Sequence, residues 1–196
     1  MKVAQMVQLH EGLQVGEGKD TFGITVKILS MQFNVYVLPI AALIPMMLGF
    51  IWYNPKVFGT AWMQASGMTL EKAKSANMVK VFGLSLLLCL LMTVALMPMT
   101  IHQMGFMSTF EGDPALKDPN SPLNAYIRDY FGQYGTRFRT FKHGALHGTL
   151  GALFLVLPAI GINALYEMKS LKYVAIHVGY LMLSMALMGG VICQFL

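Results

Sequence analysis

The sequence predicts an all-α, polytopic membrane protein whose four transmembrane helices form a bundle. Two observations carry this prediction. Hydrophobic residues make up 56% of the chain and charged residues only 12%, whereas charged residues supply about 25% of a typical soluble domain. Four long tracts also contain no Asp, Glu, Lys or Arg, namely 28–55, 81–110, 143–166 and 173–196. Each holds the roughly 20 apolar residues that a membrane span needs, and a span must be helical so that its backbone groups pair internally.

The four predicted spans belong to one membrane domain over residues 31–196. Their expected bounds are 33–53, 80–101, 143–166 and 173–195. Residues 1–30 are mixed and polar and show no signal-peptide pattern, so we interpret them as an N-terminal extension. Met31 stands directly before the first apolar tract and is therefore a candidate for an alternative start.

Turn and capping residues organise the connections between the spans. Pro39 and Pro45 predict kinks in the first span, and Pro158 predicts a bend in the third. Thr69 is placed to cap a short interfacial helix between the first two spans. Ser121, followed by proline, predicts the start of an amphipathic helix inside the polar loop 103–140. This helix either lies on the membrane or the bundle, or belongs to a small packed loop, and the sequence leaves both arrangements open.

Cationic and aromatic residues gather at the ends of the tracts, where they would meet lipid headgroups. The predicted interface anchors are Trp52, Tyr53, Trp62, Arg137, Arg139 and Lys142. The net charge of +5 comes without a basic run or a recognition module, so it does not indicate a nucleic-acid partner. Four spans put both termini on one side of the membrane. The short loops on the other side are rich in lysine, which favours termini outside.

Small residues recur at helix-packing spacing in the last two spans. These residues are Gly144, Gly148, Ala152, Gly179, Ala186 and Gly190. Such rows let backbones approach closely, either within the chain or between two copies. Asn163 is the one amide that lies well inside a predicted span rather than near its end. It predicts either a hydrogen bond to a neighbouring helix or a polar group with a functional role.

Three histidines form the candidate site of the chain. His143 and His147 are four residues apart and share one helical face. His102 ends the second span at a similar depth, so three imidazoles can converge at one membrane boundary, an arrangement known for zinc and iron. The alternative is interfacial histidines bonded to backbone, water or lipid phosphate. A haem held between His147 and His177 is excluded, because the two lie more than about 15 Å apart in depth.

Two stretches carry distinctive patterns. LGFIWYNPKVFGTAWM contains Trp52, Tyr53 and Pro55 in a Trp-Tyr-x-Pro boundary, and the second stretch runs from Asn163 to Ile192. Together they resemble a family of bacterial integral membrane proteins, the domain of unknown function 1761. The likeness covers both ends of 31–196 and leaves 1–30 and 103–140 outside. It implies four spans and a bacterial inner membrane but supplies no activity and no catalytic residue.

Three functions remain open from the sequence. The first is a non-enzymatic homo-oligomer or small subunit of a membrane assembly, whose partners are the lipid bilayer and itself or another membrane protein. The second is a metal or haem site at His102, His143 and His147 with redox or hydrolytic chemistry. The third is a carrier for a small solute or lipid. No nucleophile elbow or phosphate loop is present, so we predict no catalytic residue. No cofactor is predicted either, with a metal ion at the histidines as the alternative.

Overall fold

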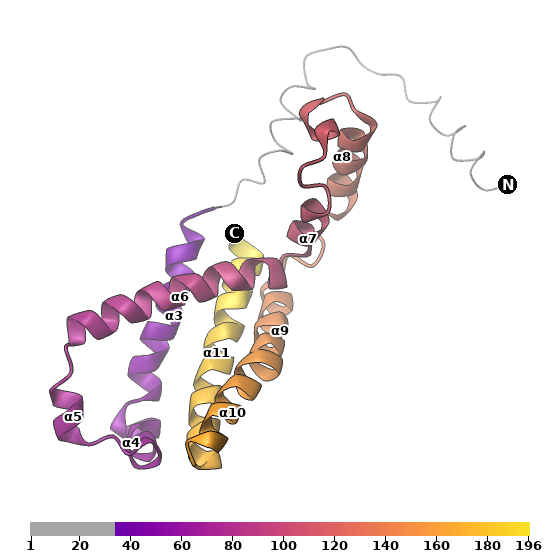
Figure 1. Cartoon of the computed structure of the whole chain (residues 1–196). Helices are drawn as coiled ribbons and strands as arrows, with labels where there is room; N and C mark the ends of the chain where they lie inside the picture. The colour runs from indigo at the N-terminus through magenta and orange to yellow at the C-terminus, as the bar shows by residue number, and fades with distance from the viewer. Residues whose placement is uncertain (1–33) are drawn as a thin grey trace. The chain divides into compact units, whose positions relative to one another are not determined.

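The computed structural model describes residues 34–196, and this part of the chain is largely helical and has no strands (Figure 1). The all-α prediction is therefore confirmed. The predicted N-terminal extension and the alternative start at Met31 lie outside the described residues.

Three helical segments are long and apolar enough to cross a membrane. They are α6 (Met78–Thr100), the continuous stretch Phe141–Tyr166, and α11 (Leu171–Phe195). Their bounds lie within a few residues of the predicted spans. A fourth crossing exists if α3 (Val37–Trp52) and the following Pro55–Ser66 segment count as one span, although the two are bent by 56°.

The first predicted span, 33–53, corresponds to α3, and the chain turns directly after this helix. Helix α3 has 16 residues and ends at Trp52. Asn54 then adopts an extended backbone, and its side chain accepts a hydrogen bond from the Lys56 N–H. Because Pro55 cannot donate a backbone hydrogen bond, it begins a new helical segment more easily than it continues the old one. A π-helical turn, Pro55–Gly59, and α4 (Thr60–Ser66) follow.

Helix α11 is the central helix of the described chain. Half of its most apolar 18-residue window is buried, compared with 17% for α6 and for Phe141–Tyr166. Its residues Met188 and Ile192 are fully buried and belong to the same core as Leu96 and Ile101 of the α6 region. The other long helices therefore pack around α11 and leave much of their own surface free for lipid.

Helix α9 (Phe141–Gly151) packs on α11 with its backbone directly against the α11 backbone at two glycines. A Cβ atom added at Gly144 would collide with the Gly189 carbonyl, and one added at Gly148 would collide with the Met185 carbonyl. Gly190 lies under the Phe141 ring, which a Cβ would approach to 2.6 Å. Ala152 is fully buried. The partner of this small-residue row is thus a helix of the same chain.

The third span changes its hydrogen-bonding pattern just before Pro158. A π-helical turn, Ala152–Val156, separates α9 from α10 (Leu157–Tyr166), and Pro158 occupies the first turn of α10. Proline has no backbone N–H, so a carbonyl in the preceding helical turn loses its usual donor. A π-helical turn is a common way to accommodate this missing hydrogen bond. The irregularity therefore falls where the sequence predicted a bend.

The polar segment between α6 and α9 is itself largely helical. It contains α7 (His102–Ser108), a 3₁₀ turn (Pro114–Lys117) and α8 (Pro122–Tyr134), which is capped by Ser121 as predicted. Tyr130 of α8 stacks on Phe106 of α7, with ring centroids 3.6 Å apart. Part of the apolar face of α8 thus meets α7, as a packed loop requires. On the other side of α6, Thr69 caps α5 (Leu70–Lys74).

The beginning and the end of the described chain meet at one end of the bundle. The Asn34 N–H donates to the Leu196 carbonyl at 3.3 Å. The Phe141 N–H donates to the Gln194 side chain at 3.0 Å, so α9 also begins at this end. The turn that follows Trp52 and the link between α10 and α11 lie at the opposite end (Figure 1).

The contact between α9 and α11 should fail when Gly148 gains a side chain. We expect Gly148→Ala to lower the free energy of unfolding by about 1–3 kcal/mol, because the new methyl group forces two backbones apart. Gly161→Ala, in the same long helix, is the matched control. A Cβ there meets nothing within 4 Å, so that variant should be neutral or more stable by up to about 1 kcal/mol. Thermal unfolding in detergent compares the two, and equal stabilities would contradict the packing described here.

A candidate metal site formed by three histidines

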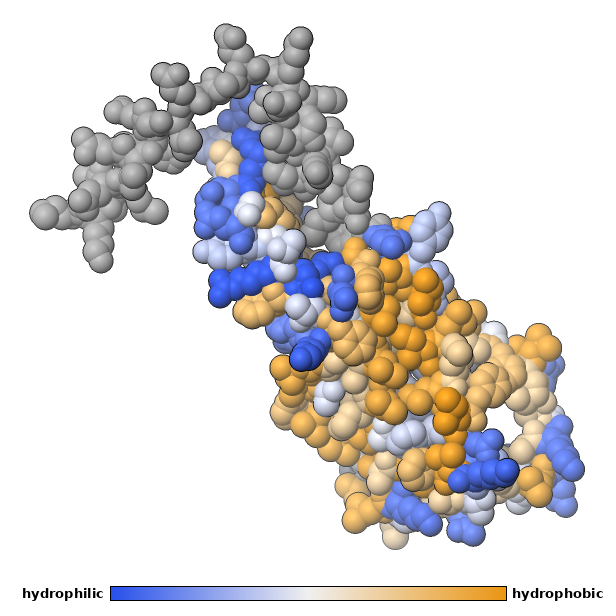
Figure 2. All heavy atoms as spheres, turned by 180° about the vertical axis from the view of Figure 1, so that it is seen from behind, coloured by the Kyte–Doolittle hydropathy of each residue, from blue (hydrophilic) through white to orange (hydrophobic). Residues whose placement is uncertain are grey.

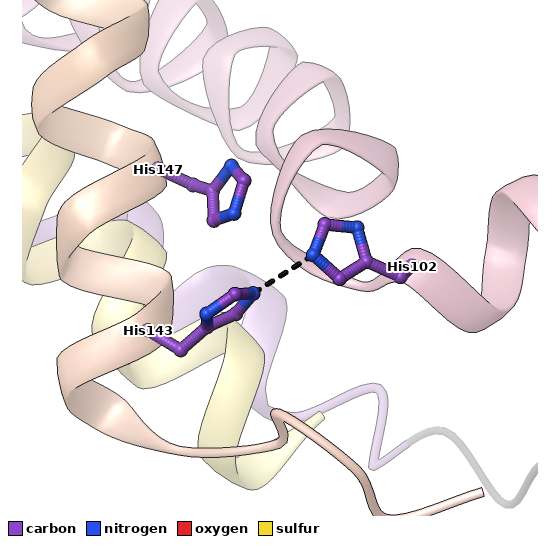
Figure 3. A group of neighbouring side chains, drawn as sticks. All are labelled: His102, His143 and His147. Carbon is purple, nitrogen blue, oxygen red and sulfur yellow. Dashed lines mark hydrogen bonds between the residues drawn. The ribbon is translucent and has the colours of Figure 1, made fainter. Parts of the chain in front are cut away.

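His102, His143 and His147 converge at the end of the bundle where α6 stops and α9 begins. Each offers a ring nitrogen, and these nitrogens all lie within 4.8 Å of one another. Figure 3 shows His143 and His147 projecting from successive turns of one helix toward His102, which stands at the start of another. His102 is exposed and the other two are partly buried, so the cluster is accessible from outside the protein.

The local sequence explains how α9 presents its two histidines. Thr140 has an extended backbone, and its hydroxyl accepts a hydrogen bond from the His143 N–H, which caps the helix. His143 and His147 follow one turn apart, and each directly precedes one of the packing glycines. Since consecutive helical residues are about 100° apart around the axis, the glycines face α11 while the histidines project to one side of that contact.

A sharp break positions His102. Ile101 is fully buried and has an extended backbone (φ −111°, ψ 93°) between α6 and α7. The break redirects the chain and places His102 at the first position of the new helix. Without this break α6 would continue past Ile101, and His102 would not stand at the first position of a helix.

The distances between the rings suit a metal ion after small side-chain rotations. His143 Nε2 lies 2.9 Å from His102 Nε2, at hydrogen-bond distance. The His147 ring centroid is 5.0 Å from that of His102 and 4.5 Å from that of His143. In a tetrahedral zinc site with Zn–N bonds of 2.0–2.1 Å, ligand nitrogens stand about 3.4 Å apart. The one nitrogen separation known individually, 2.9 Å between His143 and His102, is shorter than this value, and all three nitrogens lie within 4.8 Å of one another.

Gln103 holds the polar segment against the histidines, and sequence reasoning missed it. Its side chain is 3% exposed. Its Nε2 donates to the carbonyls of Tyr134 and Arg137, both at 2.9 Å. A buried amide that spans two carbonyls is a strong local constraint. The only signal in the sequence was its position next to His102.

Phe138 closes the site on the side of the polar segment. Its backbone has a positive φ of 64°, which is uncommon for a residue with a side chain. Its ring stacks on His143 with centroids 5.0 Å apart and meets the His102 ring edge-on at 6.2 Å. The Arg137 guanidinium lies over the same Phe138 ring at 5.2 Å. Aromatic contacts therefore hold two of the three imidazoles.

The predicted interface anchors divide between the two ends of the bundle. Arg137, Arg139 and Lys142 flank the histidines, with Arg139 partly buried and Lys142 exposed. At the other end the Trp52 indole donates to the Ile176 carbonyl at 3.1 Å and covers Gly179. There too, Tyr53 and Trp62 pack together at 5.3 Å between centroids.

The remaining predicted positions lie apart from the histidines. His177 contacts the Tyr53 hydroxyl through Nδ1 at 3.2 Å and has no contact with the cluster. Asn163 is exposed in the last turn of α10, where its backbone carbonyl accepts from Glu167. Among the described residues its side chain makes no hydrogen bond to a neighbouring helix. Ala186 lies on α11 beside the Gly148 contact.

The fold and the site together define a class of protein: an all-helical chain with three to four helices apolar enough to cross a membrane and a group of three histidines at one end. The chain belongs to the family described as Protein of unknown function (DUF1761), whose model matches residues 37–193. This match runs through 103–140, which corrects the expectation that the polar loop lies outside the likeness. A search of curated proteins found no match, and neither did a search of solved structures.

Gln103→Leu should loosen the segment that borders the histidines. We expect a loss of about 1–3 kcal/mol in the free energy of unfolding, because the carbonyls of Tyr134 and Arg137 both lose the hydrogen bond that Gln103 donates. The matched control is Gln133→Leu, since the exposed Gln133 bonds only to Asp129 on its own helix. That change should fall within about 0.5 kcal/mol of the wild type. Thermal unfolding, with hydrogen exchange across 134–138, measures both effects, and equal values for the two variants would contradict the role of Gln103.

Proposed function

We propose that this protein is a multi-pass membrane protein that binds a divalent transition-metal ion through His102, His143 and His147. The single observation that carries the proposal is the convergence of three ring nitrogens within 4.8 Å from two separate helices. Imidazole is a ligand suited to zinc, copper, iron and nickel. Zinc is the metal we favour, because three neutral imidazoles with one open position are an established zinc arrangement.

The open position decides what kind of metal site this would be. Structural zinc sites are closed by four protein ligands, whereas sites that exchange water or substrate keep a position free. No Asp, Glu or Cys joins the three histidines in the described part of the chain. The proposed ion would therefore carry an exchangeable fourth ligand. This favours reversible binding or chemistry at the ion over a purely structural role.

We further propose four spans in a bacterial inner membrane, with the histidines at one boundary. The hydrogen bond between Asn34 and Leu196 supports an even number of crossings, because the described chain enters and leaves at the same end. Counting α3 with the Pro55–Ser66 segment gives that number. The bacterial inner membrane follows from the family resemblance. The lysine-rich short loops favour placing this end, with the histidines, outside.

The small-residue row of α9 does not favour an oligomer over a metal site. In the sequence, this row was the main reason to expect a homo-oligomer or a subunit of an assembly. Gly144 and Gly148 contact α11 of the same chain, so their packing needs no second copy. The histidine geometry is the more specific observation, and the proposed function rests on it.

Metal analysis tests the proposal directly. The protein should be purified in detergent with a tag that contains no histidine, stripped with a chelator and reloaded with Zn²⁺. We expect about one zinc per chain in the wild type and close to none in a His143→Ala, His147→Ala double variant, because one imidazole cannot hold the ion alone. His177→Ala is the control and should keep its zinc.

Two results would contradict this function. One is a wild type that retains no metal after reloading with Zn²⁺, Co²⁺, Ni²⁺ or Cu²⁺. The other is a double variant that unfolds like the wild type and still binds a full equivalent. Thermal unfolding of each variant without metal separates lost binding from lost folding.

A further inference from the structure

A cavity of about 270 Å³ adjoins the histidine cluster on the side of the polar segment. Its lining residues are His102, Gln103, Tyr130, Tyr134, Arg137 and Phe138. The cavity shares a wall with the cluster, because His102 belongs to both and the Phe138 ring stacks on His143. Figure 2 shows many hydrophilic residues over α7 and α8, whereas hydrophobic residues cover the long helices. Sites for drug-sized molecules measure about 300–1,000 Å³, so this cavity suits a smaller, polar molecule.

Arg137 gives the cavity wall a permanent positive charge. Its guanidinium lies over the rings of Tyr134 and Phe138, 5.5 and 5.2 Å from their centroids. These rings hold the guanidinium beside the cavity, because a cation is attracted to an aromatic face. Among the described residues, no carboxylate pairs with Arg137 and its side chain donates no hydrogen bond. A planar fork of N–H donors is therefore left for a ligand.

His102 has a second ring nitrogen that the cluster does not use. Its Nε2 lies 2.9 Å from His143 Nε2, which is the only hydrogen bond of this ring among the described residues. Figure 3 shows the other nitrogen, Nδ1, directed away from His143. When Nε2 accepts from His143 or binds an ion, the neutral ring carries its proton on Nδ1. A metal-bound histidine almost always donates this second N–H to an acceptor, and the chain supplies none here.

The rest of the wall also lacks an acidic acceptor. No Asp or Glu is among the lining residues. Tyr130 and Tyr134 carry hydroxyls that make no hydrogen bond within the described part of the chain. Gln103 directs its amide donor to two backbone carbonyls and so fixes the wall in place. The cavity thus offers hydrogen-bond donors and one positive charge, and the ligand that matches them is an anion with several oxygens.

We propose that this cavity binds a phosphate group that pairs with Arg137 and accepts a hydrogen bond from the Nδ1–H of His102. A guanidinium fork takes two oxygens of its partner. A phosphate with three terminal oxygens keeps one for His102, whereas both oxygens of a carboxylate would already be in use. Neither His143 nor His147 lines the cavity. The phosphate therefore contacts the histidine site through His102 and leaves the open position of the ion free.

This inference rests on the proposed metal function in one respect, which is that the ion and the phosphate share His102. An ion on Nε2 keeps the proton on Nδ1 and makes that N–H a stronger donor, and an acceptor on Nδ1–H makes Nε2 a better ligand. Each should therefore raise the affinity for the other by the same factor. A free phosphate and the headgroup of a lipid at the membrane boundary carry this same chemistry, and the experiment separates the two.

Equilibrium dialysis with ³²P-labelled inorganic phosphate measures binding to the full chain in an uncharged detergent. The protein is compared in its metal-free form and after loading with zinc, with unbound zinc removed. We expect about one phosphate per chain in both forms, with roughly tenfold higher affinity after loading, which is the usual effect of a partner to a metal-bound histidine.

Arg137→Gln should weaken phosphate binding by roughly tenfold or more, because charge-assisted hydrogen bonds are lost. Arg128→Gln is the matched control, since it removes an equal charge from α8 outside the cavity, where Arg128 bonds to the Pro119 carbonyl. Its affinity should stay within about twofold of the wild type, because salt screens distant surface charges. Arg137→Lys keeps the charge without the fork and should be intermediate, which keeps the test decisive if Arg137→Gln does not fold.

Competition identifies the source of the phosphate group. The competitors are unlabelled inorganic phosphate and dihexanoyl phosphatidic acid, which carries a phosphate monoester on a short-chain lipid. Dihexanoyl phosphatidylcholine has the same chains with a blocked phosphate and should displace nothing. Stronger displacement by phosphatidic acid assigns the cavity to a lipid headgroup, and stronger displacement by inorganic phosphate assigns it to the free anion.

Three results would overturn the proposal. The first is an absence of saturable binding in the zinc-loaded protein. The second is equal affinity in folded Arg137→Gln and Arg128→Gln variants, because general surface charge would then explain the binding. The third is equal affinity with and without zinc, which contradicts the shared role of His102. Zinc content is measured in the same samples, so a protein that holds one zinc but no phosphate fails only here, and a protein that holds phosphate through Arg137 but no zinc fails only in its proposed metal function.

Discussion

The backbone contact between α9 and α11 is the constraint on which the rest of the structure depends. Gly144 and Gly148 let the two helices touch at the carbonyls of Gly189 and Met185. In a membrane no hydrophobic force distinguishes a neighbouring helix from lipid, so close van der Waals approach holds such a pair together. This contact sets the rotation of α9 about its axis. It thereby also sets the direction in which His143 and His147 point.

A second set of contacts, at the same end of the bundle, places His102 beside the other two histidines. Cys193 of α11 lies between the carbonyls of Thr100 and Phe138, 3.3 Å from each. Gln103 ties the end of α8 and the residues after it to the start of α7. The histidines thus meet because three separate segments are anchored around one end of α11. A rigid surround of this kind is what a preorganised metal site requires.

Sequence patterns predicted the helices well because capping and hydropathy act locally. Thr69 and Ser121 cap the helices expected of them. The depth of the three histidines also followed from counting residues along the spans. Their rotation about the helix axes did not, because it depends on which face of α9 meets α11. The partner of the α8 aromatic face was equally undetermined, since periodicity defines a face but does not say what covers it.

The two ends of α11 carry different chemistry, and helix length keeps them apart. His177 lies at one end, and Gly189, against which α9 packs, lies twelve positions further along α11, about 18 Å at 1.5 Å per residue. An ion at the proposed histidine site would therefore lie far from His177. Two helices connect these ends, α11 and α6, which stops just before His102. Helix α11 contacts Gly144 and Gly148 of α9, and its own Gly179 contacts Trp52. A shift of α11 would therefore change packing contacts at both of its ends. The glycine contacts are the least able to absorb such a shift, because they join backbone to backbone and leave no side chain free to rearrange.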